Sequence, residues 1–183
     1  MRLMESRIVS AILPVVKRLA LLMLLVLSSS GQTAAQSGPD WLTLDEGQTL
    51  VTANEKILFI FFEAEWCSIC KRMKKKVFPN ADVLVALNEG FVPVSIDLDS
   101  KLPISFNGED YTERSFSQAM QVEATPTLVF TDDQGNILGG TSGYFDPERF
   151  LLLLDYVKTD AFMEMEFTDF EKVSKERSST RGD

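Results

Sequence analysis

The pentapeptide Trp66-Cys67-Ser68-Ile69-Cys70 contains both cysteines of this 183-residue chain. An apolar run, 57–62, precedes it and a basic run, 71–76, follows it. The apolar run does not alternate with polar residues, which predicts a central strand that is covered on both faces. From the first cysteine onward the apolar residues recur at helical spacing, which predicts a helix that ends at Pro79. The two cysteines therefore lie where a buried strand is followed by a helix.

Two thiols in this arrangement can be oxidised and reduced reversibly. The first residue of a helix faces unpaired backbone N–H groups and the positive end of the macrodipole, which favours a thiolate. We therefore expect Cys67 to be the nucleophile and Cys70 the resolving thiol, and the pair to form a disulfide when oxidised. Trp66, Ser68 and Ile69 would border the substrate. An inert structural bridge is the alternative, although closing so short a loop constrains little of the unfolded chain.

The composition excludes several other kinds of site. The chain has no histidine, so Ser-His and Cys-His catalysis and imidazole metal sites are excluded. Two cysteines alone do not complete a tetrahedral zinc site, and we expect neither a metal nor a cofactor. The net charge of −9 opposes binding to nucleic acid.

The first 35 residues have the layout of a secretory signal peptide. Basic residues precede a wholly apolar run, 19–27, and small residues follow at 33–35. Nine apolar residues are too few to span a hydrocarbon core of about 30 Å. We therefore expect residues 1–35 to be cleaved after Ala35 and 36–40 to form a linker. An uncleaved N-terminal membrane anchor is the alternative.

Helix and strand patterns continue on both sides of the cysteines. A helix is predicted up to about residue 54, with Leu50 and Val51 facing inward. Residues 91–97 alternate like a strand. Pro93 places this strand at a sheet edge or at a bulge, because proline cannot donate to a hydrogen-bond ladder.

The second half of the chain contains a long connection, a hairpin and a final helix. Residues 98–111 contain Pro103, Asn107-Gly108 and several polar residues and predict a loop, and a helix is predicted over 113–121. Two short apolar runs around an Asp/Gly-rich turn predict a β-hairpin over 127–141. An Asp-Pro start predicts the last helix, 146–157. Residues 158–183 form a polar extension that we expect to be partly disordered, with an amphipathic segment over 162–173 and disorder from residue 174 onward.

This order of elements resembles the thioredoxin fold over residues 41–157. A strand, Trp-Cys-x-x-Cys at a helix start, a crossover to a second strand, Thr125-Pro126 before a hairpin and a final helix follow one another. The resemblance implies an α/β domain with a central mixed sheet of about four strands, flanked by helices. Within this superfamily the chain is most similar to exported bacterial thiol-disulfide oxidoreductases of the SoxW type. These share the Thr-Pro-Thr segment and the Gly143-Tyr144 pair before a phenylalanine-rich helix.

The resemblance also implies roles for residues outside the pentapeptide. Pro126 corresponds to a proline that is cis and lies against the dithiol, and the backbone of Thr125 would pair with an extended substrate. The buried carboxylate that thioredoxins place six residues before the first cysteine is replaced here by Phe61. Glu63 lies on the same strand face, so we expect it to accept the proton of the resolving thiol. An exposed glutamate at the strand end is the alternative.

We expect, from these residues and this resemblance, a periplasmic thiol-disulfide oxidoreductase that reduces disulfides in exported proteins. The expected partners are those proteins and a membrane thiol-disulfide electron donor, and we expect a monomer. The absence of histidine between the cysteines separates the site from strong oxidants of the superfamily. Two alternatives stay open: disulfide oxidase or isomerase activity, and a non-catalytic binding module whose disulfide only rigidifies the fold.

Overall fold

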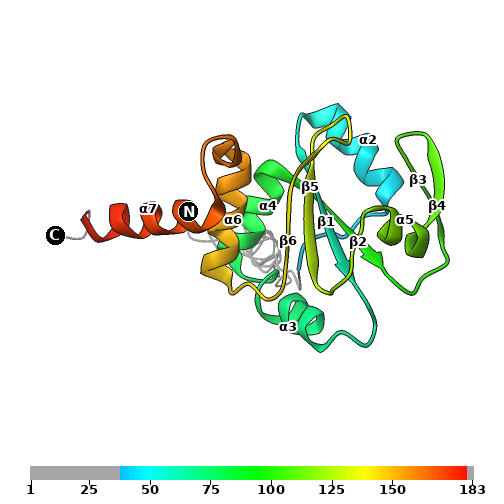
Figure 1. Cartoon of the computed structure of the whole chain (residues 1–183), viewed down its shortest axis with the longest axis horizontal. Helices are drawn as coiled ribbons and strands as arrows, with labels where there is room; N and C mark the ends of the chain where they lie inside the picture. The colour runs from blue at the N-terminus through cyan, green and yellow to red at the C-terminus, as the bar shows by residue number, and fades with distance from the viewer. Residues whose placement is uncertain (1–37, 181–183) are drawn as a thin grey trace, which may run out of the picture. The chain divides into compact units, whose positions relative to one another are not determined.

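The computed structural model describes residues 38–180 (Figure 1), so the expected signal peptide lies outside the described residues. A central sheet holds four strands in the order β2-β1-β5-β6. They are β1 (Ile57–Glu63), β2 (Phe91–Asp97), β5 (Thr127–Thr131) and β6 (Ile137–Ser142). Strands β1 and β2 are parallel, whereas β5 pairs antiparallel with both β1 and β6. The predicted mixed sheet of four strands is thus confirmed.

Helices cover both faces of this sheet, as Figure 1 shows. One face packs against α3 (Ser68–Lys76), α4 (Ala81–Gly90) and α6 (Pro147–Lys158). The opposite face packs against α2 (Leu44–Asn54), α5 (Glu113–Ala119) and a short second sheet. Each outer layer buries its own hydrophobic cluster, so the sheet is the middle of three layers.

Strand β1 is buried on both faces, which explains why the apolar run before the cysteines does not alternate. Phe59 and Phe61 belong to the cluster under α3, α4 and α6. Leu58, Ile60 and Phe62 belong to the other cluster. All five side chains are at most 1% exposed. Packing from both layers therefore fixes the end of β1, from which the chain leads to the cysteines.

Strand β2 lies at one edge of the sheet and accommodates Pro93, as predicted. The carbonyl of Pro93 accepts a hydrogen bond from the Leu42 backbone N–H at 3.0 Å, so the segment before α2 covers part of this edge. In α2, Val51 is buried but Leu50 is 41% exposed, so the inward orientation predicted for Leu50 is wrong. Adjacent helical residues point about 100° apart, and only one of the two can face the sheet.

The stretch 98–111 is not the plain loop that we expected. It contains most of a two-stranded hairpin, β3 (Pro103–Phe106) and β4 (Glu109–Thr112). Asn107 and Gly108 form the turn with φ angles of 52° and 80°, a left-handed conformation that these two residue types favour. Aromatic side chains of the hairpin pack on α5. The hairpin therefore extends the hydrophobic layer formed by α2 and α5.

The C-terminal extension is helical beyond the amphipathic segment that we predicted. A 3₁₀ turn, η1 (Ala161–Met163), leads into α7 (Phe167–Thr180). The Tyr156 ring of α6 contacts two phenylalanine rings of α7, and Arg149 pairs with Glu171 at 3.0 Å. These contacts stabilise the predicted amphipathic segment, and the helix continues to Thr180, into the stretch where we expected disorder. Within residues 38–180, no helix is long and apolar enough to cross a membrane.

Candidate active site

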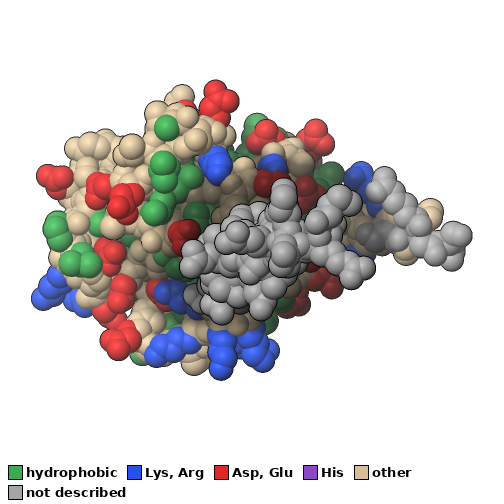
Figure 2. Space-filling view, turned by 180° about the vertical axis from the view of Figure 1, so that it is seen from behind, with side chains coloured by type: hydrophobic (Ala, Val, Ile, Leu, Met, Phe, Trp, Pro, Cys, Tyr) green, Lys and Arg blue, Asp and Glu red, His purple; other side chains and the backbone are tan. Residues whose placement is uncertain are grey.

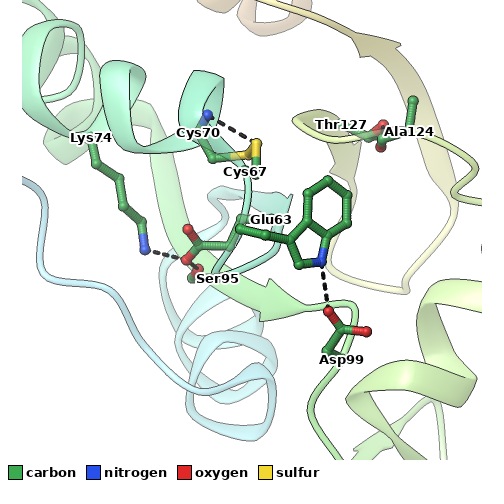
Figure 3. Close-up of a disulfide and its surroundings, with 9 residues drawn as sticks. Glu63, Cys67, Cys70, Lys74, Ser95, Asp99, Ala124 and Thr127 are labelled. Atoms are coloured by element: carbon green, nitrogen blue, oxygen red, sulfur yellow. Dashed lines mark hydrogen bonds and ion pairs between the residues drawn. A yellow bond between two sulfur atoms is a disulfide. The ribbon is translucent and has the colours of Figure 1, made fainter.

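The two cysteines form a disulfide at the start of α3 (Figure 3). Their Cα atoms lie 5.3 Å apart, within the ordinary range for a disulfide. Cys67 caps the helix, and its sulfur accepts a hydrogen bond from the Cys70 backbone N–H at 3.0 Å. Cys67 is 4% exposed, whereas Cys70 is fully buried. A thiolate on Cys67 would receive the same hydrogen bond and the positive end of the helix macrodipole.

Exposed side chains surround the disulfide. Trp66 is 69% exposed and Ile69 is 44% exposed, and Ser68 is exposed as well. The indole N–H of Trp66 donates to a carboxylate oxygen of Asp99 at 2.8 Å (Figure 3). The Arg114 guanidinium donates to the other oxygen of Asp99 at 3.3 Å. Hydrogen bonds that run from Arg114 of α5 through Asp99 therefore orient the mostly exposed Trp66 indole.

The loop before β5 belongs to the surroundings of the disulfide (Figure 3). The peptide bond between Thr125 and Pro126 is cis, and Pro126 is buried. The Thr127 hydroxyl donates to the Ala124 carbonyl at 2.7 Å and closes the loop. The Thr125 hydroxyl oxygen is buried, and within the described part of the chain it has no hydrogen-bond partner. Buried polar atoms are rarely unpaired, so this oxygen is an exception within the described part of the chain.

Glu63 lies in a polar cluster between β1, β2 and α3. Its side chain is 16% exposed and forms an ion pair with Lys74 of α3. The Ser95 hydroxyl donates to the same carboxylate oxygen, Oε1, at 2.5 Å. Phe61 is fully buried in the hydrophobic cluster under α3. The carboxylate of this polar cluster is thus carried by residue 63 and not by residue 61. Glu63 is mostly buried and is not the exposed strand-end glutamate of the alternative interpretation.

Our sequence analysis did not identify four residues that contact the predicted site: Lys74, Ser95, Asp99 and Arg114. Only Lys74 had a local signal, because it follows Cys70 by one helical turn. Ser95 meets Glu63 through the pairing of β2 with β1, and no local pattern encodes that register. Asp99 lies 33 residues from the indole that it binds. Among the described residues, no group of three or more Cys, Asp or Glu side chains is placed to hold a metal ion.

The class of protein follows from this arrangement. A sulfur in the field of a helix N-terminus is suited to exchange, because the field stabilises the thiolate. The Cys67–Cys70 pair after the central strand of this fold defines a thioredoxin-like domain with a Cys-x-x-Cys disulfide at its helix start. The chain belongs to the family of thioredoxin-like domains, whose sequence profile matches residues 44–158. The matched segment runs from the start of α2 to the end of α6 and includes every site residue named above.

Comparisons with individual proteins give similarities to disulfide-exchange proteins. The chain is 29% identical over 110 residues to the thiol:disulfide interchange protein DsbD of Pseudoalteromonas atlantica. The aligned segment covers 58% of this chain and 17% of that protein. The chain therefore spans less than a fifth of this relative's length.

Two solved structures have the same fold. A putative disulphide-isomerase from Bacteroides thetaiotaomicron is 29% identical, with a TM-score of 0.52 over 70% of this chain and 96% of that one. A thioredoxin-fold protein from Helicobacter pylori is 20% identical, with a TM-score of 0.54 over 71% and 88% of the two chains.

Proposed function

We propose that this protein is a periplasmic thiol-disulfide oxidoreductase that reduces disulfides in exported proteins. The observation that carries the proposal is the Cys67–Cys70 pair, which caps α3 and is surrounded by exposed side chains. The similarity to DsbD, a thiol:disulfide interchange protein, supports the same chemistry. The signal-peptide pattern of residues 1–35 supports export.

In the proposed reaction the reduced protein gives two electrons to a client disulfide. The Cys67 thiolate attacks one client sulfur, the client S–S bond breaks, and the other client sulfur leaves as a thiolate that takes up a proton. The Cys70 thiol then loses its proton and attacks the Cys67 sulfur, which releases the second client thiolate. The products are the Cys67–Cys70 disulfide and a client dithiol. The capped position of Cys67 and the burial of Cys70 support this order.

Glu63 is the proposed acceptor of the Cys70 proton. It shares the strand face of Phe61, which packs in the same hydrophobic cluster as Cys70. Lys74 and Ser95 both bind Oε1, and among the described residues none donates a hydrogen bond to Oε2. Oε2 is therefore the oxygen that can accept a proton, directly or through one water.

The exposed side chains and the cis-proline loop form the proposed client-binding surface. Trp66, Ser68 and Ile69 border the disulfide on the α3 side. The backbone of Thr125, next to Pro126, would pair with an extended client segment as an added strand.

The proposal also includes a direction of electron flow and a donor. Electrons would enter from a membrane thiol-disulfide protein, which the similarity to DsbD supports. Isomerisation of client disulfides is a second candidate, which the 29% identity to the putative disulphide-isomerase of Bacteroides thetaiotaomicron favours. A reduction potential near −270 mV would identify a reductant, and one near −120 mV an oxidant.

Insulin reduction tests the enzymatic part of the proposal. We expect the wild-type protein to reduce insulin disulfides in the presence of dithiothreitol, and Cys67→Ser to be inactive. Equal inactivity of both proteins would contradict catalysis and favour the binding module. Mass spectrometry of protein from a periplasmic extract tests export, and the expected mature chain begins at Gln36.

A further inference from the structure

Helix α3 carries an unbalanced positive charge next to the disulfide. It contains five Lys or Arg residues and no acidic residue, on a chain whose net charge is −9. Lys74 is paired with Glu63. The other four are exposed and lie on one side of the helix, at spacings of one and four residues. We call these four residues the α3 basic face: Lys71, Arg72, Lys75 and Lys76.

Acidic residues of the described fold do not neutralise the lysine charges of this face. Among residues 38–180, none of its three lysines forms an ion pair, although acidic residues outnumber basic ones. Figure 2 shows Lys and Arg side chains gathered along the lower edge of the molecule, the edge where α3 lies in Figure 1. The basic face is therefore open to an external partner.

Helix stability does not explain the face either. Lys75 and Lys76 lie in the last turn, where positive charge complements the macrodipole. Lys71 and Arg72 lie in the N-terminal half of the helix, where they gain no such benefit. Each also stands four residues before a like charge, an arrangement that destabilises a helix. The charge pattern is thus unfavourable for α3 on its own, which points to a role in binding.

The basic face adjoins the surface on which a client would lie. The Arg72 guanidinium lies over the Tyr144 ring, 4.4 Å from its centroid. The neighbouring Gly143 backbone N–H donates to the Pro126 carbonyl at 2.9 Å. The cis-proline loop, the segment after β6 and α3 are therefore joined in one continuous surface. A client segment paired with Thr125 can extend along it towards α3.

The distances allow these charges to act on a bound client. At a rise of about 1.5 Å per residue, Lys71 to Lys76 lie about 6 to 14 Å along the helix from Cys67. The Debye length is about 10 Å at 0.1 M ionic strength, so more distant carboxylates of the chain are largely screened. The charges close to the disulfide, and not the net charge of −9, therefore govern its field; the carboxylates nearby are Glu63, which is paired with Lys74, Asp99, which is paired with Arg114, and Glu65.

We infer that the α3 basic face binds acidic residues that flank the reactive cysteine of a client or donor protein. The protein would thereby select acidic disulfide-bearing segments. The inference rests on the proposed exchange function and adds the chemistry of the partner. An anionic membrane is a weaker match, because the rest of the chain is acidic and a bilayer on this face would cover the disulfide.

Three synthetic disulfide peptides test the inference. They differ only in the residues beside the cysteine, which are glutamate, glutamine or lysine. Second-order rate constants with the reduced protein are measured by stopped flow at ionic strengths of about 10 and about 300 mM. We expect the glutamate peptide to react about tenfold faster than the lysine peptide at low salt, and the difference to shrink at high salt. Equal rates for the charged peptides would refute the inference.

A triple variant assigns the preference to the helix. Lys71→Gln, Lys75→Gln and Lys76→Gln together should bring the ratio of the glutamate and lysine peptide rates close to one. A ratio that stays near ten would place the selectivity elsewhere and overturn the inference. Thermal unfolding of the variant verifies that the fold is intact before the rates are compared.

A matched control removes the same charge far from the disulfide. Lys56→Gln, Lys172→Gln and Lys175→Gln should leave both the rates and the preference unchanged, because Lys56 precedes the opposite end of β1 and the others lie in α7. Loss of preference in this variant would show a general charge effect and contradict the inference.

Two further measurements separate the possible failures. Failure of the wild-type protein to react even with the glutamine peptide would refute the exchange function itself. Reaction with all three peptides at one rate would refute only the acidic preference. Sedimentation with phosphatidylglycerol vesicles tests the membrane alternative. Lysine-dependent binding to vesicles without any peptide preference would replace our inference with that alternative.

Discussion

Replacing Glu63 by glutamine removes the negative charge from the polar cluster and keeps its size. The amide oxygen can still accept the hydrogen bond from Ser95, but the ion pair with Lys74 is lost. If Glu63 accepts the Cys70 proton, the resolving step must then proceed without a protein base. The step should slow at neutral pH and recover as the pH rises towards the range where an unassisted thiol ionises, about 8.5.

The expected loss of rate is larger than any effect on stability. A positioned base contributes about 10²-fold or more, and a 10²-fold loss equals about 2.7 kcal/mol of activation free energy. The side chains of the ion pair are 36% and 16% exposed, so we expect its loss to lower the free energy of unfolding by about 1 kcal/mol or less. A large kinetic effect with a small shift in unfolding therefore identifies the proton acceptor.

The resolving step can be observed directly with a chromophoric disulfide. Reaction of the reduced protein with an excess of 5,5′-dithiobis(2-nitrobenzoate) places one thionitrobenzoate on Cys67, and attack by Cys70 releases it. The release rate is measured by stopped flow from about pH 5 to pH 9, a range that brackets ordinary thiol ionisation. Glu65→Gln, at an exposed glutamate, is the matched control and should behave like the wild type. An identical pH profile in Glu63→Gln would refute the assignment.

Three further predictions concern the surroundings of the site and the stability of the fold. Asp99→Ala removes the hydrogen-bond acceptor of the Trp66 indole, so the indole N–H resonance should shift in NMR spectra. The value of kcat/KM for peptide disulfides should fall about threefold to tenfold, which corresponds to about 1 kcal/mol of activation free energy. An unchanged resonance would exclude the contact in solution. Tyr156→Phe removes the hydrogen bond to the Met165 carbonyl and should lower the free energy of unfolding in urea by about 1 kcal/mol. Burial and the charge of Glu166 raise the pKa of Tyr156. The stabilisation by this hydrogen bond is therefore present below about pH 10 and is lost as the pH rises through the raised pKa. Urea unfolding curves of the wild type and of Tyr156→Phe should then converge. Asp132→Ala removes the acceptor of three hydrogen bonds at the β5–β6 turn and should lower stability by about 1 to 2 kcal/mol. Partial burial acts to raise the pKa of Asp132, but the hydrogen bonds from Asn136 and the turn amides outweigh it and hold this pKa below its ordinary value. The contribution to stability is therefore present above about pH 4 and is lost as the pH falls through the lowered pKa, which thermal denaturation of the wild type should show.

The elements with a regular apolar period were predictable from the sequence. The run before the cysteines predicted β1 because a strand buried on both faces needs apolar residues at every position. The Cys67 and Cys70 positions on α3 followed from the change to helical spacing at that point. The alternation of strand side chains placed Phe61 and Glu63 on one face without any tertiary information.

The polar elements were not predictable in the same way. The hairpin of β3 and β4 was missed although Asn107-Gly108 is a common turn pair, because each strand has only four residues, too few for an alternating pattern to stand out. An amphipathic segment over 162–173 was predicted, but the last turns of α7 were not, because residues 174–180 are polar and the support from α6, through Tyr156 and Arg149, lies earlier in the helix. Both elements depend on packing against residues distant in the chain.

The sequence by itself determined the order of the elements, the redox pair and the face of β1 that carries Glu63, because backbone geometry sets periods of two and 3.6 residues locally. Only the tertiary structure decided what those residues meet. Lys74 and Ser95 reach Glu63 across α3 and β2, and Asp99 reaches the Trp66 indole from 33 residues away. Such contacts depend on strand register and on how the helices lie over the sheet, and both are settled by the packing of the whole hydrophobic core.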